Sequence, residues 1–192
     1  MDIVKEIEDL LLSTEIEGID GLCEYMRGGL GFYKAPCSGG NHLSKEGGLA
    51  EHSLNVFKCA EKIAKALLGT KGYNKVKNDI IVCALLHDIG KCGDFGKQNY
   101  IPNILKSGKP SDSKPFKSNP DLLYVDHEIR SVKICAMFID LTEEQEHAIL
   151  YHNGLYGALK YSLQGKETPL YMIVHWADMW ASRVIESEVE KC

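Results

Sequence analysis

Six histidine and aspartate side chains stand where the spacing of apolar residues predicts the interior of the protein. They are His52, His87, Asp88, His127, His152 and Asp178. An unpaired imidazolium or carboxylate is costly to bury, so this set requires a compensating charge or a complete hydrogen-bond network. A divalent metal ion supplies that charge, and imidazole together with carboxylate suits first-row transition ions. The pattern therefore predicts a metal site.

A hydrogen-bonded core residue is the competing interpretation for each of these histidines. Taken singly, any one of them is better explained in that way, because buried polar side chains usually find partners. The same exception to the apolar pattern recurs, however, on five predicted helices. This recurrence favours metal binding. We expect Mn, Fe, Zn, Ni or Mg, bound as one ion or as two.

Helices are the elements that must position these side chains. Apolar residues recur every three or four positions, and this spacing predicts helices rather than strands. The expected helices span residues 3–12, 49–68, 74–89, 126–138, 142–152 and 168–189. Gly69 and Gly90 should end the second and third, and Thr142 with Gln145 forms a capping-box pattern at the fifth. We therefore expect an all-α helical bundle, with a helical extension over residues 1–41 and the main domain over residues 42–192.

Residues 93–124 differ from the rest of the chain. They contain four of the six prolines and five lysines, with little apolar periodicity. Such a composition is typical of a long irregular connection, and loops of this length often serve as lids over a site. The sequence predicts an irregular, locally basic loop here.

Three short motifs resemble the signature of the HD superfamily of metal-dependent phosphohydrolases. His87 and Asp88 are adjacent in LLHDIGK, His52 precedes them in GGLAEHS, and Asp178 follows in HWAD. The resemblance covers residues 42–186. The stretch NHLSKEGGLAEHS is similar to HD domains attached to bacterial 3'-to-5' exoribonucleases and to small stand-alone HD hydrolases of bacteria and phages.

The resemblance implies how the ligands would be shared between ions. Members with only the four core ligands hold one metal, here His52, His87, Asp88 and Asp178. Members with two further histidines hold a second metal, which His127 and His152 would take, with Asp88 bridging. The resemblance favours two ions, although the sequence alone does not show that these two histidines reach the site rather than bind substrate.

Further residues are candidates for catalysis and for substrate binding. Besides Asp88, Lys91 would place an ammonium near the phosphate, as the lysine of HDxGK does in similar enzymes, or it would stabilise a helix terminus. His42 would contact substrate or protonate the leaving group, or it is a surface-loop histidine. Arg130 would bind phosphate or form a surface salt bridge. His175 is expected to orient a ligand rather than to be one.

Composition limits the other classes of function. The formal charge is -5 and the seven cysteines are widely spaced without a CxxC pair, so we expect reduced thiols and no affinity for duplex nucleic acid. Acidic residues interrupt the first twelve positions and no stretch is apolar enough to cross a membrane, which predicts a cytoplasmic protein. The sequence carries no signal for an oligomeric state.

The leading functional prediction is a nucleotidase or phosphodiesterase that hydrolyses a small phosphorylated, nucleotide-like substrate with a metal-activated water. One alternative is an HD-type di-iron oxygenase. The other is a non-catalytic nucleotide-binding module, which the complete ligand set disfavours.

Overall fold

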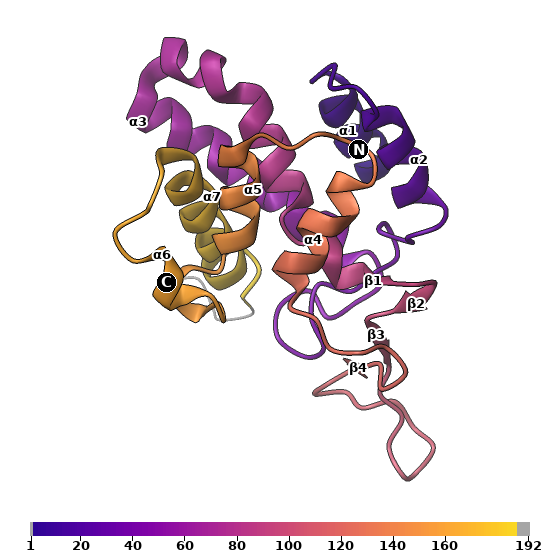
Figure 1. Cartoon of the computed structure of the whole chain (residues 1–192). Coiled ribbons are helices and arrows are strands. Elements are labelled where there is room, and N and C mark those ends of the chain that lie inside the picture. The colour runs from indigo at the N-terminus through magenta and orange to yellow at the C-terminus, as the bar shows by residue number, and fades with distance from the viewer. Residues whose placement is uncertain (1, 188–192) are drawn as a thin grey trace.

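The computed structural model describes residues 2–187, and they form a mostly helical domain (Figure 1). Its helices are α1 (Ile3–Leu12), α2 (Ile19–Arg27), α3 (Gly48–Leu86), α4 (His127–Ala136), α5 (Glu143–Tyr151), α6 (Lys160–Leu163) and α7 (Pro169–Trp180). Shorter helical turns are η1 (Ile89–Cys92), η2 (Gly154–Tyr156) and the π-helical turn η3 (Ala181–Ile185). The predicted helical character of the fold is confirmed.

Helix α3 covers the region where two helices were predicted. Gly69 has φ 66° and ψ 172°, which are not helical values, so it bends the chain sharply and separates two helical halves. Glycine tolerates this conformation because it has no Cβ. The second half ends at Leu86, earlier than predicted, since Asp88 has φ -105° and ψ 7° and the chain continues as η1. His87 and Asp88 therefore lie just beyond the helix.

The remaining predicted helices are present with shifted ends. The capping box is confirmed, since Thr142 accepts from the backbone of Gln145 and the Gln145 side chain accepts in return. Thr168 caps α7, and Pro169 occupies its first position, where a missing N–H costs nothing. The expected end of this helix, Val189, lies outside the described residues, and helical conformation stops at Ile185.

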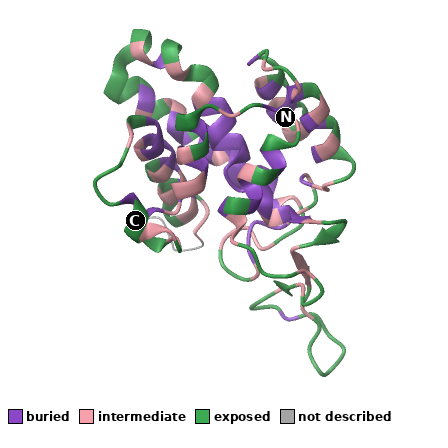
Figure 2. Cartoon of the chain, in the orientation of Figure 1, coloured by how far each residue is buried: buried purple, intermediate pink, exposed green. Residues whose placement is uncertain are grey.

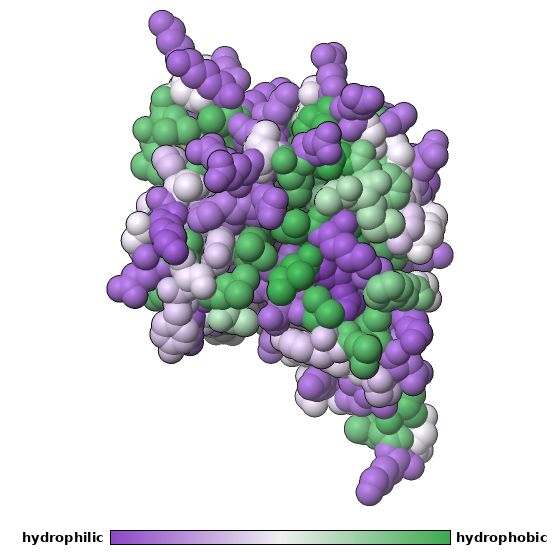
Figure 3. All heavy atoms as spheres, in the orientation of Figure 1, coloured by the Kyte–Doolittle hydropathy of each residue, from purple (hydrophilic) through white to green (hydrophobic). Residues whose placement is uncertain are grey.

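Residues 93–124 are not wholly irregular, and they add two small sheets to the predicted helical fold. Strand β1 (Gly93–Asp94) pairs antiparallel with β2 (Lys97–Gln98), and β3 (Tyr100–Pro102) pairs antiparallel with β4 (Phe116–Ser118). Strands of two or three residues are too short to show an alternating pattern in the sequence. They form an arm that extends from the helices and ends in hydrophilic side chains (Figure 3). Helix α2 was also missed, because the pattern over nine residues is brief.

A single hydrophobic core joins α1 and α2 to the rest of the chain. Ile7 and Met26 belong to the same buried cluster as Ile81 and Leu85 of α3. Figure 2 shows buried residues gathered at the centre of the molecule, where the last turns of α3, Ile80–Leu86, are buried throughout. This helix ends beside the candidate site, so the best-buried element of the fold carries His87 and Asp88.

Two further features of the described chain concern its cysteines and its helices. The six cysteines within residues 2–187 are free and buried, while Cys192 lies outside the described residues. No helix of the described chain combines the length and the apolar character needed to cross a membrane.

Candidate metal centre

The six predicted ligand side chains come together from five segments of the fold. His52 is on the first turns of α3, His87 and Asp88 follow its end, and Asp178 is on α7. His127 begins α4 and His152 directly follows α5. Most of these positions are helix termini, so the packing of several helix ends against one another creates the cluster.

One half of the cluster forms around Oδ2 of Asp88. This oxygen lies 3.5 Å from Nε2 of His52 and 3.4 Å from Nε2 of His87. The two imidazole Nε2 atoms are 3.3 Å apart, and Nε2 of His52 is 3.2 Å from Oδ1 of Asp178. Donor atoms at such separations can share one ion at ordinary ligand distances of about 2.0–2.2 Å.

The other half forms around Oδ1 of the same carboxylate. This oxygen lies 3.1 Å from Nε2 of His127 and 3.4 Å from Nε2 of His152. Asp88 thus turns each of its two oxygens toward a different pair of histidines. This is the arrangement that a carboxylate bridging two ions requires.

The tautomers of the four imidazoles follow from their surroundings, because each ring has an acceptor near Nδ1. The pairs are His52 with Glu186 at 2.9 Å, His87 with the Ala84 carbonyl at 3.0 Å, His127 with Glu128 at 3.3 Å, and His152 with the Ile149 carbonyl at 2.8 Å. A ring that donates from Nδ1 in its neutral form has a lone pair on Nε2. In their neutral form, the four rings can therefore direct their Nε2 lone pairs toward the two oxygens of Asp88.

This donor set fits divalent cations. Oδ1 of Asp88 is buried and has no hydrogen-bond partner. Lone pairs and carboxylates facing one another in a buried space repel unless a cation lies between them. The residues present would hold one ion between His52, His87, Asp88 and Asp178 and a second between His127, His152 and Asp88.

The electrostatic surroundings keep both aspartates ionised. Burial alone would raise the pKa of Asp88, but Lys91 and the neighbouring imidazoles hold it well below its usual value. Burial is likewise outweighed at Asp178, where the hydrogen bond and charge of His52 lower the pKa. Burial would lower the pKa of Lys91, yet Asp88 keeps it raised, so the lysine stays charged. Ionised carboxylates are the form that binds metal.

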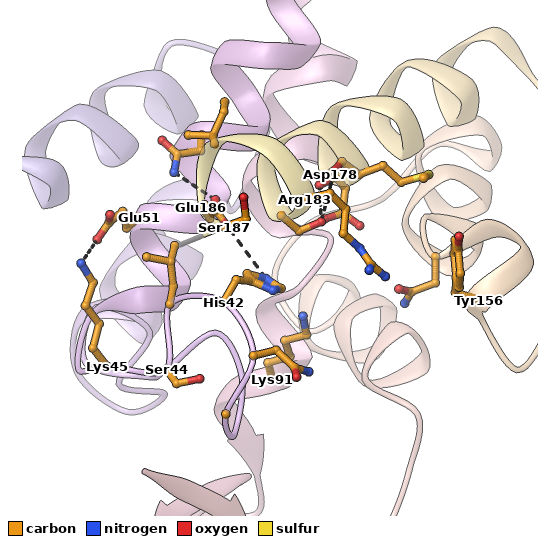
Figure 4. Close-up of a pocket in the computed structure, with 18 of the residues that line it drawn as sticks. His42, Ser44, Lys45, Glu51, Lys91, Tyr156, Asp178, Arg183, Glu186 and Ser187 are labelled. Atoms are coloured by element: carbon orange, nitrogen blue, oxygen red, sulfur yellow. Dashed lines mark hydrogen bonds and ion pairs between the residues drawn. The ribbon is translucent and has the colours of Figure 1, made fainter. Parts of the chain in front are cut away.

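A cavity of about 1130 Å³ opens beside the cluster and reaches Asp178. Figure 4 shows His42, Lys91 and Arg183 among the residues around it. Lys91 donates to Oδ2 of Asp88 at 2.6 Å, which places its ammonium between the metal ligands and the cavity. Arg183 lies over the ring of Tyr156 at 5.6 Å and forms no ion pair within residues 2–187. Lys91 and Arg183 thus place positive charge in a cavity that carboxylates, among them Asp112 and Asp178, also line.

Of the other residues that the sequence suggested, His42 and His175 line the cavity and Arg130 does not. His42 lines the cavity, and its Nε2 is 3.2 Å from Sγ of Cys37. Arg130 is not among the cavity residues: it is buried, it donates to the Leu123 carbonyl at 3.1 Å, and it makes no salt bridge in the described structure. His175 lies 2.6 Å, at Nδ1, from the carbonyl of His152, which suits its expected role in orienting a ligand.

Sequence reasoning missed several polar residues that belong to the site. Nδ2 of Asn153 lies 3.1 Å from Nε2 of both His127 and His152 and donates to Glu128 at 2.7 Å. The position of Asn153 directly after His152 in the sequence is the signal that could have identified it as part of the site. Glu186 was missed because a regular helix would direct it away from Asp178, eight residues earlier, by about 80°.

Comparison with known proteins adds three findings. A family model described as the HD domain matches residues 49–181. Over 63 residues, 33% of this chain, the sequence is 43% identical to the dihydroneopterin 2',3'-cyclic phosphate phosphodiesterase of Methanocaldococcus jannaschii. The chain spans 25% of that relative's length. No solved structure matches significantly.

Proposed function

Because this chain belongs to the HD domain family, we propose that it is a metal-dependent phosphohydrolase that cuts a phosphate ester of a small, nucleotide-like molecule. The observation that carries the proposal is the position of Asp88, whose two oxygens face two different pairs of histidine Nε2 atoms. This geometry supports two ions over one. Divalent ions at these positions would supply an acidified water as nucleophile and would polarise a phosphoryl oxygen.

The side chains of the protein provide the remaining functions. Lys91 holds a permanent positive charge beside Asp88, where it would offset charge that develops on the phosphoryl oxygens. Arg183 can bind a phosphate oxygen pair in bidentate fashion. His42 lies on the same cavity and would contact the leaving group. Arg130 is left out of this scheme because its guanidinium is directed to the Leu123 carbonyl.

A phosphodiester is the substrate class that we put first. The relative from Methanocaldococcus jannaschii is named for action on a 2',3'-cyclic phosphate, and the matching stretch is a third of the present chain. The cavity, at about 1130 Å³, is large enough for a nucleoside or pterin carrying such a group. Hydrolysis of a 2',3'-cyclic phosphate consumes one water and opens the ring to a phosphomonoester.

The test is a hydrolysis screen on the purified protein loaded separately with Mn, Fe, Zn, Ni or Mg. Substrates are 2',3'-cyclic nucleotides, nucleoside mono-, di- and triphosphates, cyclic dinucleotides and p-nitrophenyl esters. We expect metal-dependent release of a phosphomonoester from a phosphodiester, lost when His87 and Asp88 are both replaced by alanine. Turnover that persists in this double variant would refute the proposal. For the iron-loaded protein, hydrolysis under anaerobic conditions separates the proposed reaction from oxygenase chemistry, which consumes oxygen.

A further inference from the structure

Glu186 is a buried carboxylate just beyond the last helix, and its side chain is only 2% exposed. One oxygen, Oε2, lies 2.9 Å from Nδ1 of His52. The other, Oε1, accepts from Nδ2 of Asn55 at 2.9 Å. Nε2 of His42 is 3.7 Å from Oε2. The carboxylate therefore connects the end of the last helical segment to His52 and Asn55 of α3 and to the loop that carries His42.

The π-helical turn η3 gives Glu186 this position. The backbone N–H of Glu186 donates to the carbonyl of Ala181, five residues earlier, at 2.9 Å. A five-residue bond widens the turn by one residue and changes the direction of the side chains that follow it. Asp178 precedes the wide turn and Glu186 follows it, and both reach His52. Two oxygens from one helical segment thus contact opposite nitrogens of the same ring.

His52 differs from the other three imidazoles in where its Nδ1 acceptor comes from. His87 and His152 use backbone carbonyls three residues earlier in their own helices, and His127 faces the neighbouring Glu128. Those acceptors stay in place as long as the helix itself is formed. The acceptor for His52 is 134 residues away in the sequence. Its ring orientation consequently depends on one distant side chain.

We propose that Glu186 is a positioning residue that holds His52 with Nδ1 protonated and the Nε2 lone pair directed at the metal centre. A carboxylate that accepts from the far nitrogen of a ligand histidine fixes both the tautomer and the orientation of the ring. Without Glu186, the ring of His52 can rotate or move its proton to Nε2, which removes the donor. The inference rests on the metal centre of the proposed function and concerns metal binding before any substrate is present.

The experiment measures the affinity of the full chain for Co²⁺ and Mn²⁺ by calorimetry and equilibrium dialysis, without substrate. Glu186→Ala should weaken binding of the ion that His52 holds by roughly 10- to 100-fold. Glu186→Gln should retain part of the affinity, because its amide oxygen can still accept from Nδ1. The Co²⁺ absorption spectrum should change in the alanine variant, since the ligand field depends on the ring. Circular dichroism identifies any variant that does not fold.

The matched control is Glu61→Ala. Glu61 is a carboxylate on α3 that pairs with Lys65 and Tyr73, and it lies outside the cavity. This control should leave the affinity for metal unchanged.

A double variant separates positioning from a general loss of structure. In a His52→Ala background, Glu186→Ala should have no further effect on metal affinity, because the ring that it holds is gone. Unchanged affinity in Glu186→Ala, or equal losses with and without His52, would overturn the inference. If the wild-type chain bound no divalent ion at all, the proposed function would fail. If it bound tightly and Glu186→Ala bound equally well, only the present inference would fail.

Discussion

The carboxylate of Asp88 meets the imidazole of His127 at 3.1 Å, from Oδ1 to Nε2, on the side of the carboxylate that faces away from Lys91. Lys91 instead contacts Oδ2, the oxygen shared with His52 and His87. Asp88 therefore contacts two pairs of imidazoles and the ammonium of Lys91.

Replacement of the shared carboxylate should remove both ions. Asp88→Asn keeps the size of the side chain but lacks the negative charge that both halves of the cluster use. Elemental analysis of the dialysed protein should show metal content falling toward zero. Asp94→Asn, which alters a carboxylate paired with Lys133 outside the cavity, should leave the metal content intact. Full metal content in Asp88→Asn would contradict the bridging role.

The two ions should bind with unequal affinity. The amide nitrogen of Asn153 lies between Nε2 of His127 and Nε2 of His152, at 3.1 Å from each. An ion entering that half must displace this donor, whereas the half with Asp178 has a second carboxylate to attract its ion. A calorimetric titration should show a tighter and a weaker step.

Asn153→Ala should strengthen the weaker step by removing the competing donor. Asn119→Ala, in the arm formed by the short strands, is the control because its side chain bonds only within that arm. A weaker second step in Asn153→Ala would mean that the amide acts as a ligand through its oxygen.

Lys91 should matter for turnover more than for metal binding. Lys91→Met keeps most of the volume of the side chain and removes the charge next to the reacting phosphate. We expect kcat to fall by about 100-fold or more, as when one transition-state donor is removed. Metal content should stay within the range of the wild type. Lys133→Met, which alters a lysine paired with Asp94, should have wild-type kcat.

Removal of the metal should lower thermal stability, because the convergent lone pairs and carboxylates then repel. An ion at 100 times its dissociation constant stabilises the folded state by about 2.7 kcal/mol. For a chain of this size that corresponds to a shift in Tm of roughly 5–10 °C. Differential scanning calorimetry with and without a chelator measures it. Identical transitions would show that the cluster is stable without a cation.

Gly90 should tolerate no side chain. A Cβ at this position would lie 2.2 Å from the carbonyl of His127 and 2.7 Å from the backbone nitrogen of Ser131. Backbone atoms cannot move aside as side chains do, so α4 must shift. Gly90→Ala should lose about 1–3 kcal/mol of unfolding free energy in a urea titration. Gly21→Ala is the control, since its Cβ would make an ordinary contact with Phe138 at 3.5 Å.

The sequence predicted the long elements well because their periodicity extends over several turns. The bend at Gly69 and the capping box at Thr142 rest on local chemistry that a short window contains. The end of α3 was predicted three residues late, because Asp88 leaves the helical conformation before Gly90, the residue at which the sequence predicted the stop. The short strands were missed because their pairing depends on residues up to 18 positions apart, as for Tyr100 with Ser118.

The convergence of these six side chains was predictable because imidazole and carboxylate at apolar positions are conspicuous in a sequence. The supporting residues were not. Glu186 looks like any acidic residue at the end of a helix, and only the π-helical turn brings it to His52. Arg130 was predicted from its spacing to His127, and tertiary packing buries it with one guanidinium nitrogen donating to the Leu123 carbonyl.

The backbone carbonyls of Ala84 and Ile149 fix two of the four rings from within the helices that bear them. Donor angles that are built into a final helical turn do not change when distant loops change. The walls of the cavity, by contrast, include the segment around His42 and the side chains of Tyr156 and Arg183. Randomising those wall positions should therefore redirect the enzyme among substrates without altering which metals it takes up.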